Sequence, residues 1–422
     1  MGRPAWGGTQ LQPLTMMVAS DPGAGGAADP GRRRPWTTSR ALLVTVAGTI
    51  AYTQPVFLTG ALSVQLTGEL AFGVAGLGLA VGVFRGTAAL TSVHLGRLVD
   101  RLGSVRSLRL AAAISAISSA GIAWTSVNLV TFAAWLVLAG TANAIGQPAT
   151  NRLLHRLIPP GRQGIAFGVK QAAVPVSTML AGLAIPVIAL TVGWRWAFAL
   201  PTLLLILLIL LSARVGQRTP MPRRRARADR AGNPTERLQD RPTIVLLAAA
   251  IGLGMAGASV APAFFVDSAV RGGLRPEIAG VTLAIASVTT VLSRLAAGYV
   301  VDRMGNDQLN LAAGMVLVGA FGFAALAVGR PAWSTVGIII AMALGWGFNG
   351  VFWYCLVRAY PQSPARATGA VAPGGLLGSS LGPIVFGVVV ERTSYTVGWS
   401  VASGLGLLAA SAMYLAGRRL RR

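Results

Sequence analysis

Cysteine, histidine and acidic residues are scarce in this 422-residue chain, which has one cysteine, two histidines and twelve aspartates and glutamates. A single cysteine excludes an internal disulfide and a cysteine-based metal site. Cys355 lies in an apolar stretch and is expected to be a small buried side chain. His94 and His155 are expected near helix ends and form no ligand cluster, so a structural role is favoured over metal binding.

Motifs of enzymes and ATP-driven pumps are also missing. The chain contains no P-loop, no nucleophile elbow and no HExxH sequence. The stretch GLGMAG at 252–257 fits GxGxxG, but no strand precedes it and it lies inside an apolar segment. Helix packing therefore explains it better than dinucleotide binding. We expect a protein that is not an enzyme and that holds no metal and no cofactor.

Long apolar runs dominate what is present. Hydrophobic residues make up 54% of the chain, charged residues 11%, and the mean hydropathy is +0.64. About 20 apolar residues in a helix cross about 30 Å of hydrocarbon. Segments of this length predict an all-α membrane protein with twelve transmembrane helices, at 41–63, 72–95, 106–126, 129–151, 163–190, 195–213, 242–266, 277–299, 308–328, 332–356, 367–390 and 396–416.

Polar segments divide the chain into domains. Residues 1–38 are rich in glycine, proline and arginine and lack the apolar core of a signal peptide, so they predict a disordered cytoplasmic tail. A basic cytoplasmic linker is expected at 214–241. We expect six-helix bundles at 39–213 and 242–416, followed by a basic tail at 417–422.

The distribution of basic residues predicts the orientation. With a cytoplasmic N-terminus, 28 of the 36 lysines and arginines fall in the tails and cytoplasmic loops. This positive-inside signal predicts a multi-pass protein of the cell membrane with both termini cytoplasmic. It also accounts for the net charge of +24, and nucleic-acid binding is not expected because no basic face interleaved with aromatics occurs.

Two short sequences are repeated. GRLVDRLG at 96–103 returns as GYVVDRMG at 298–305, and TVGW at 191–194 returns at 396–399. The offsets are 202 and 205 residues. Each octapeptide follows the second predicted helix of its half, and each TVGW precedes the sixth. The halves are therefore predicted to be parallel structural repeats.

The octapeptides resemble the signature G-x-L-a-D-R-x-G-R-[RK] of the major facilitator superfamily. The first copy matches it through Gly96, Leu98, Val99, Asp100, Arg101 and Gly103, and the weaker second copy keeps Gly298, Val300, Val301, Asp302, Arg303 and Gly305. Ser104 and Val105 replace the basic pair that normally follows, although Arg106 lies close by. The resemblance covers about 40–416 and implies two parallel six-helix repeats around a midplane site.

The resemblance also implies that the signature loop is a gate. Its glycines permit a tight turn and a close approach of helices. Asp100 is expected to meet the positive N-terminal end of the eleventh helix, around Ala367 to Gly369, in one state of a two-state equilibrium. A simple turn between two helices is the alternative.

Three basic residues are left inside predicted helices. Arg85 lies about 16 Å before the signature loop, and a charge at that depth costs about 2.5 kcal/mol or more, so it is expected to face the transport pathway. The repeat offset maps Arg85 onto Ser287 and Ser92 onto Arg294. Arg294 and the chain's single lysine, Lys170, are expected either to line the same pathway or to extend to the cytoplasmic surface.

Polar and aromatic residues at helical spacing complete the predicted pathway. The candidates are Tyr52 and Gln54 in the first helix, Asn143, Gln147 and Asn151 in the fourth, and Trp346, Asn349 and Trp353 in the tenth. The alternative for each is interhelical hydrogen bonding and packing.

The predicted substrate is a small organic anion. The arginine of the eighth helix is similar in position to one that meets the substrate carboxylate in monocarboxylate-type facilitators, and guanidinium binds carboxylate in a bidentate manner. No acidic residue lies at the centre of a predicted helix. We expect a monomeric secondary transporter in the lipid bilayer that moves a carboxylate by alternating access; coupling to a proton, exchange and facilitated diffusion stay open. The alternative is a proton-coupled multidrug or metabolite exporter.

Overall fold

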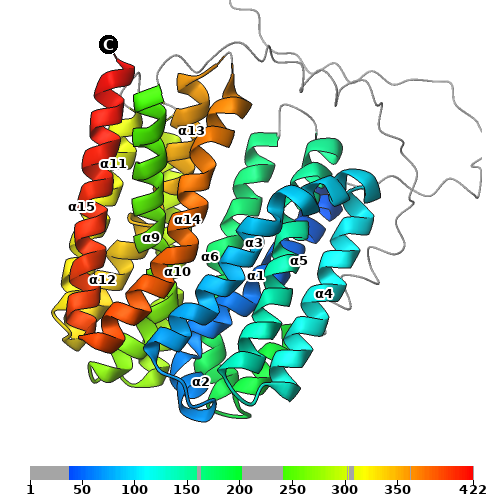
Figure 1. Cartoon of the computed structure of the whole chain (residues 1–422), viewed down its shortest axis with the longest axis vertical. Helices are drawn as coiled ribbons and strands as arrows, with labels where there is room; N and C mark the ends of the chain where they lie inside the picture. The colour runs from blue at the N-terminus through cyan, green and yellow to red at the C-terminus, as the bar shows by residue number, and fades with distance from the viewer. Residues whose placement is uncertain are drawn as a thin grey trace, which may run out of the picture. The chain divides into compact units, whose positions relative to one another are not determined.

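The computed structural model describes residues 38–158, 163–201, 241–301, 303, 308–361 and 363–421, and these fold almost entirely as helices (Figure 1). They belong to one compact unit, Trp36–Arg422. Of the predicted N-terminal tail at 1–38 and the predicted linker at 214–241, the structure describes only the last residues, Thr38 and Arg241.

The helices follow the predicted segments closely. The N-terminal half contributes α1 (Thr38–Ala61), α2 (Ser63–Glu69), α3 (Val74–Leu102), α4 (Ser104–Thr125), α5 (Leu129–Leu157), α6 (Gln163–Ala184) and the π-helical turn η2 (Ile185–Ala189). The C-terminal half contributes α9 (Arg241–Arg271), α10 (Pro276–Val301), α11 (Gln308–Ala327), α12 (Pro331–Ala343), α13 (Asn349–Ala359), α14 (Pro364–Arg392) and α15 (Tyr395–Leu420). Within the described chain, ten spans are long and apolar enough to cross a membrane. The predicted all-α membrane fold is confirmed.

The predicted sixth segment is only partly described. Residues 194–201 are helical, and the remainder of 195–213 lies outside the described residues. Because α1, α3, α4 and α5 alternate in direction along the chain, as do α9, α10 and α11, the helix ends divide between two faces. We call the face that carries Arg101, Arg156 and Arg418 the basic face, and the face that carries α2 the opposite face (Figure 1).

The signature octapeptide at 96–103 is mostly helical, which corrects its prediction as a loop. α3 continues to Leu102, because the residues between the two glycines carry no helix-breaking signal. Gly103 supplies the expected turn with a φ of 80°. A Cβ on Gly96 or Gly298 would meet no atom within 4 Å, so the close helix approach expected at these glycines is wrong.

The tenth predicted segment, 332–356, is broken rather than continuous. α12 ends at Ala343, residues 344–348 form a turn, and α13 starts at Asn349. A Cβ on Gly319 of α11 would collide with the backbone of Gly345 in this turn. The close approach that these glycines permit places the turn directly against α11.

The two halves pack closely near the opposite face. α3 packs along α14, α6 along α10, and α1 along α9. Glycines permit this contact near the helix ends: a Cβ on Gly60 would overlap the backbone of Pro262, and one on Gly78 would overlap that of Pro383. Small residues at interhelical contacts allow the close backbone approach on which packing in a membrane depends.

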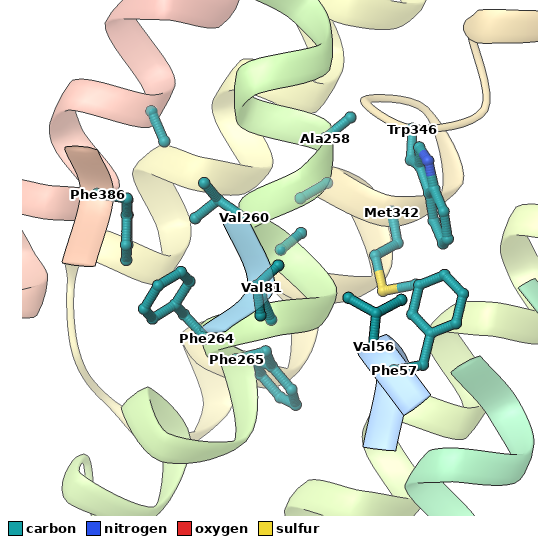
Figure 2. Packing of buried hydrophobic residues seen from close by; sticks show 14 of the residues in the cluster. Val56, Phe57, Val81, Ala258, Val260, Phe264, Phe265, Met342, Trp346 and Phe386 are labelled. Carbon is teal, nitrogen blue, oxygen red and sulfur yellow. The ribbon is translucent and has the colours of Figure 1, made fainter. Parts of the chain in front are cut away.

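Large buried side chains from both halves form one core at this contact (Figure 2). Phe57 of α1, Val81 of α3, and Phe264 and Phe265 of α9 all belong to this cluster. The ring of Phe57 lies 5.9 Å from that of Trp346, in the turn between α12 and α13. Aromatic and aliphatic packing therefore fills the space between the halves on the side of the opposite face.

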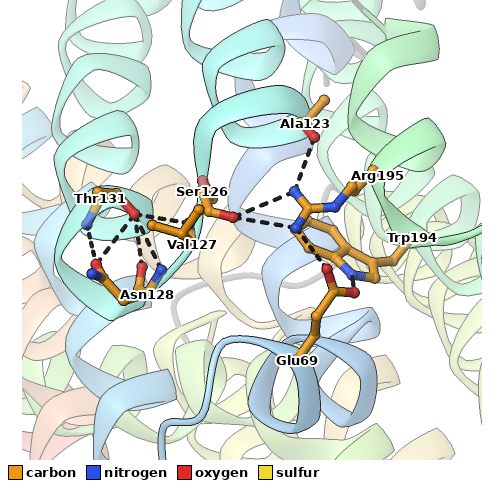
Figure 3. A network of polar contacts seen from close by, with 8 residues as sticks. All are labelled: Glu69, Ala123, Ser126, Val127, Asn128, Thr131, Trp194 and Arg195. Atoms are coloured by element: carbon orange, nitrogen blue, oxygen red, sulfur yellow. Dashed lines mark hydrogen bonds and ion pairs between the residues drawn. The ribbon is translucent and has the colours of Figure 1, made fainter.

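Both copies of TVGW end in a tryptophan that ties helices together at the opposite face. Trp194 donates its indole N–H to Glu69 at 2.5 Å, and Trp399 donates to Ser268 at 2.8 Å (Figure 3 shows the first copy). Arg195 also binds Glu69 at 2.6 Å. The hydrogen bond from Trp194, together with Arg195, holds the pKa of the Glu69 carboxyl below its ordinary value.

Candidate functional site

Arg85 and Arg294 are half-buried arginines on equivalent helices of the two halves. Arg85 lies eleven residues, about 16 Å, from the start of α3, which is near the middle of about 30 Å of hydrocarbon. The Nε atoms of Arg85 and of Arg294 are buried without a hydrogen-bond partner. The ion pairs seen among the described residues use other arginines. Each half therefore places an unneutralised cation within the membrane span.

Arg294 points to the space between the halves and not to the basic face. Its Nη1 donates to the backbone oxygen of Gln171 in α6 at 3.2 Å, and its Nη2 lies 3.5 Å from the backbone oxygen of Trp346. The guanidinium also lies 5.3 Å from the centre of the Trp346 ring. Its partners are thus neutral oxygens and a π face, which leave its charge available to an anion.

The serines that replace each arginine in the opposite repeat are bonded within their own helices. Ser287 donates to the backbone oxygen of Leu283 at 2.8 Å, and Ser92 donates to that of Ala89 at 2.7 Å. Such back-bonding satisfies the hydroxyl locally. The swapped positions therefore leave one arginine in each half at a different depth.

Lys170 is buried inside the N-terminal half. Its side chain is only 2% exposed, so it does not extend to the surface. Its Nζ donates to Gln147 at 2.5 Å and to Asn151 at 2.7 Å, both on α5. The neighbouring residue, Gln171, is the one whose backbone binds Arg294. Lys170 and Gln147 thus form a polar cluster adjacent to the arginine site.

The two predicted residues of α1 differ in their surroundings. Tyr52 is fully buried, and its hydroxyl lies 3.0 Å from Thr49 and 3.2 Å from Thr150, so that it joins α1 to α5. Gln54 is also buried, but its Oε1 has no hydrogen-bond partner. It lies one turn before Phe57, on the side of α1 that meets Trp346.

The remaining predicted pathway residues lie on α5 and α13. Asn143 is half-buried one turn before Gln147. Asn349 begins α13 directly after the turn, and its Oδ1 is buried without a partner. Trp353 packs on the core with its ring 5.5 Å from that of Phe352. Gln54, Arg85, Arg294 and Asn349 therefore share buried polar atoms that lack a partner, which is the property expected of groups that await a ligand.

The first signature copy makes a contact within its own half. Asp100 forms an ion pair with Arg152 of α5, and its side chain is half exposed. The backbone N–H of Ala367, in the helix end expected to meet Asp100, donates to Ser363. Arg101 is exposed.

The second signature copy is only partly described. Arg303 donates to the backbone oxygen of Tyr299 at 3.1 Å and lies over the ring of that residue. Asp302 and Gly305 lie outside the described residues. The role of both signature copies as a gate stays a prediction.

Two acidic residues at the opposite face were not selected from the sequence. Asp267 is 3% exposed and binds Arg271, one turn later, at 2.8 Å and the hydroxyl of Tyr395. The spacing of Asp267 and Arg271 was the signal available for this pair. Glu391 of α14 contacts the N-terminus of α3. No group of three or more metal-binding side chains occurs among the residues that the structure describes.

One apolar crevice lies away from the arginines. It has a volume of about 460 Å³, lies between α9, α14 and α15, and is lined by apolar residues such as Leu253, Leu381 and Phe386. A crevice without polar groups cannot compensate the charge of an ion. The candidate site therefore remains the arginine site.

Comparison with known proteins identifies relatives of the chain. The family model of the Major Facilitator Superfamily matches residues 41–383. The probable nitrate/nitrite transporter NarK2 of Mycobacterium tuberculosis is 29% identical over 370 residues, which cover 83% of this chain and 90% of the relative.

Solved structures share the fold. The inward-open xylose transporter XylE from E. coli superimposes with a TM-score of 0.73 at 18% identity, covering 90% of this chain and 96% of XylE. The nucleoside transporter NupG gives a TM-score of 0.70 at 16% identity, covering 90% of this chain and 98% of NupG. At these identities the likeness establishes the arrangement of helices and not the substrate.

Proposed function

The chain belongs to the Major Facilitator Superfamily and is a secondary transporter, and we propose that it carries a small anion with Arg85 and Arg294 as its binding groups. The observation that supports this proposal is a pair of half-buried arginines, one in each half. Their Nε atoms are buried without a hydrogen-bond partner, and the ion pairs seen among the described residues use other arginines. A charged side chain at this depth costs about 2.5 kcal/mol or more. An anion that binds such an arginine offsets this cost, because it supplies the missing acceptors.

The position of the arginines fits transport by alternating access. One belongs to α3 and the other to α10, so each half supplies one binding group. Arg294 additionally binds the backbone of α6 in the other half. A ligand that interacts differently with two arrangements of the halves shifts their populations. The site thus couples occupancy to the arrangement of the halves.

The chemistry of guanidinium restricts the substrate class. Its planar fork of N–H donors matches planar anions that present two oxygens. Small carboxylates have this form, and so do nitrate and nitrite, which are named for the NarK2 relative. We propose a planar anion of this kind as the substrate, moved across the cell membrane by a monomer with its basic face in the cytoplasm.

The acidic residues of the described chain do not favour the alternative, an exporter of cations. Glu69, Asp100, Asp267, Glu277 and Glu391 all lie toward the ends of the helices. A proton-coupled exporter of cationic compounds usually uses a carboxylate within the membrane. The arrangement therefore supports an anion over a cation.

Uptake into liposomes tests the proposal. Formate, acetate, lactate, nitrate and nitrite are supplied to reconstituted protein, with and without a pH gradient. Saturable uptake of at least one anion is expected, and Arg85→Ala or Arg294→Ala should raise its KM about 10- to 100-fold, the effect of losing charged hydrogen bonds. Arg85→Lys keeps the positive charge but lacks the paired planar N–H donors of guanidinium. It should therefore restore only part of the affinity that Arg85→Ala loses.

The matched control is Arg418→Ala, which removes an exposed arginine at the end of α15. This variant should transport normally. Absence of uptake for all five anions, together with movement of a cationic dye driven by a pH gradient, would instead support the exporter.

A further inference from the structure

Glu391 of α14 caps the N-terminus of α3, which belongs to the other half of the protein. Its carboxylate accepts a hydrogen bond from the backbone N–H of Ala75 at 2.5 Å, across a sequence separation of 316 residues. The residue that precedes α3 is Gly73, and α3 has no side-chain cap and no acidic residue in its first turn. The first turn of α3 thus receives its anionic cap from the C-terminal half.

Glycine at position 73 makes room for this carboxylate. A Cβ at Gly73 would lie 2.5 Å from Oε2 and 2.9 Å from Oε1 of Glu391. Any larger residue would therefore displace the carboxylate from the helix end. Gly73, directly before α3, thus leaves the space that the carboxylate of Glu391 on α14 occupies.

The same two helices touch along the neighbouring turns. A Cβ on Gly387 would lie 2.7 Å from the backbone oxygen of Val74, and one on Gly78 would overlap the backbone of Pro383. The Glu391 contact therefore ends a continuous close packing of α3 on α14 at the opposite face. Separation of the halves at this face must break both the packing and the cap.

We infer that Glu391 stabilises the state that is closed at the opposite face, by capping α3 from the other half. The inference rests on the proposed function in one respect, since it assumes transport by alternating access. In that process the halves separate at one face while they remain together at the other. A charged cap that exists only when the opposite face is closed biases this equilibrium.

Each of the helices α3 and α14 has an acidic residue near its C-terminal end that can contact the N-terminal end of the other helix. At the basic face, Asp100 at the end of α3 is expected to meet the start of α14 in the other state. In this structure Asp100 binds Arg152 within its own half, while Glu391 at the end of α14 binds the start of α3. In this structure, therefore, the contact of Glu391 with α3 is formed at the opposite face, while Asp100 binds Arg152 and not α14.

Distances between spin labels test the inference without a substrate. One pair of labels, at Val127 and Val328, spans the halves at the opposite face, and both positions are exposed. A second pair, at Arg156 and Arg418, spans them at the basic face. Labels are introduced after Cys355→Ala, which removes the chain's single cysteine.

Two variants remove the cap in different ways. Glu391→Gln removes the charge, and Gly73→Ala displaces the carboxylate while leaving its charge in place. Each should raise the ratio of open to closed molecules at the opposite face about two- to fivefold, the effect of losing an exposed charge at a helix terminus. The basic-face pair should shift toward shorter distances in parallel.

Glu277→Gln is the matched control, because it removes a carboxylate at the same face whose partner, Arg275, belongs to its own half. It should leave both distance distributions unchanged. If Glu391→Gln lowers the unfolding temperature but neither cap variant changes the distances, Glu391 is a structural cap only and the inference is overturned. If Glu391→Gln does not fold, Gly73→Ala alone decides between these results.

The outcome is independent of the substrate. Shifted distances in a protein that takes up no anion would uphold the inference while contradicting the proposed anion. Anion uptake with unshifted distances would uphold the proposed function and contradict the role of Glu391.

Discussion

Arg294 and Trp346 are held together twice, through the guanidinium over the indole ring at 5.3 Å and through a 3.5 Å contact to the tryptophan's backbone oxygen. Trp346 lies in the turn between α12 and α13 and is 4% exposed. A buried cation over an indole gains more than an exposed one, because less water competes for the cation. Trp346 thus fixes the position of the cation in the proposed anion site.

Replacing Trp346 should weaken anion binding. We expect Trp346→Leu to raise the KM of the transported anion about two- to tenfold, since the contact of the guanidinium with the ring is lost. Trp346→Phe, which keeps an aromatic face, should have a smaller effect. Uptake kinetics in liposomes measure this, with Trp333→Leu at an exposed tryptophan as the control. Equal KM values for the leucine and wild-type proteins would contradict the role of the ring.

The polar cluster around Lys170 should be more sensitive to loss of an acceptor than to loss of the lysine. Gln147→Leu leaves a buried ammonium short of an acceptor, whereas Lys170→Met removes the charge itself. We therefore expect Gln147→Leu to lower the unfolding temperature more than Lys170→Met does. Thr141→Ala, whose hydroxyl bonds only to Val137 of its own helix, is the control. The reverse order of the two unfolding temperatures would disprove this account.

Asp100→Asn should shift the equilibrium between the two states. The charge of Asp100 is expected to stabilise the state in which the basic face is closed, because it then meets the start of α14. Its removal should decrease the labelling of cysteines engineered where the halves meet at the opposite face, for example at Val81, which is 1% exposed in this structure. Labelling that is unchanged by the substitution would argue that the first signature copy is only a turn.

Acid should weaken the contact between Glu69 and the TVGW tryptophan. Because Trp194 and Arg195 lower the pKa of Glu69 below 4.5, its contribution to stability is present above that value and is lost as the pH falls through the lowered pKa. Glu69→Gln should therefore flatten the acidic part of a plot of unfolding temperature against pH. Trp194→Phe should do the same in part, while Trp196→Phe, at an exposed position, should not. Parallel curves for wild type and Glu69→Gln would refute this expectation.

Much of the fold could be predicted from the sequence, because a membrane requires apolar segments of a fixed length. The end of α3 at Leu102 and the interruption of the tenth segment at 344–348 could not be predicted. Both depend on which glycine ends a helix inside an otherwise helical or apolar sequence. Gly345 and Gly347 were the local signals of the interruption. Their effect depends on α11, which lies against the turn and whose position no local pattern reveals.

The candidate site was predicted in composition but not in its contacts. The depth of Arg85 in a predicted helix was sufficient to select it, since a cation at that depth requires a reason. Tyr52 met the same criteria of polarity and position, yet the structure uses its hydroxyl between α1 and α5. Glu391 escaped selection because its partner lies 316 residues away. The sequence shows which polar side chains within the membrane require a hydrogen-bond partner. Only the packed helices show which of these side chains have one.

The long separation between Glu391 and Ala75 also has a consequence for synthesis of the protein. When the N-terminal half leaves the ribosome and inserts, the first turn of α3 has no acceptor of its own, and water must serve its free N–H groups. The carboxylate that replaces this water is made 316 residues later. The first half therefore completes the N-terminal cap of α3 only after the second half has been made, so this part of the native structure depends on the order of synthesis.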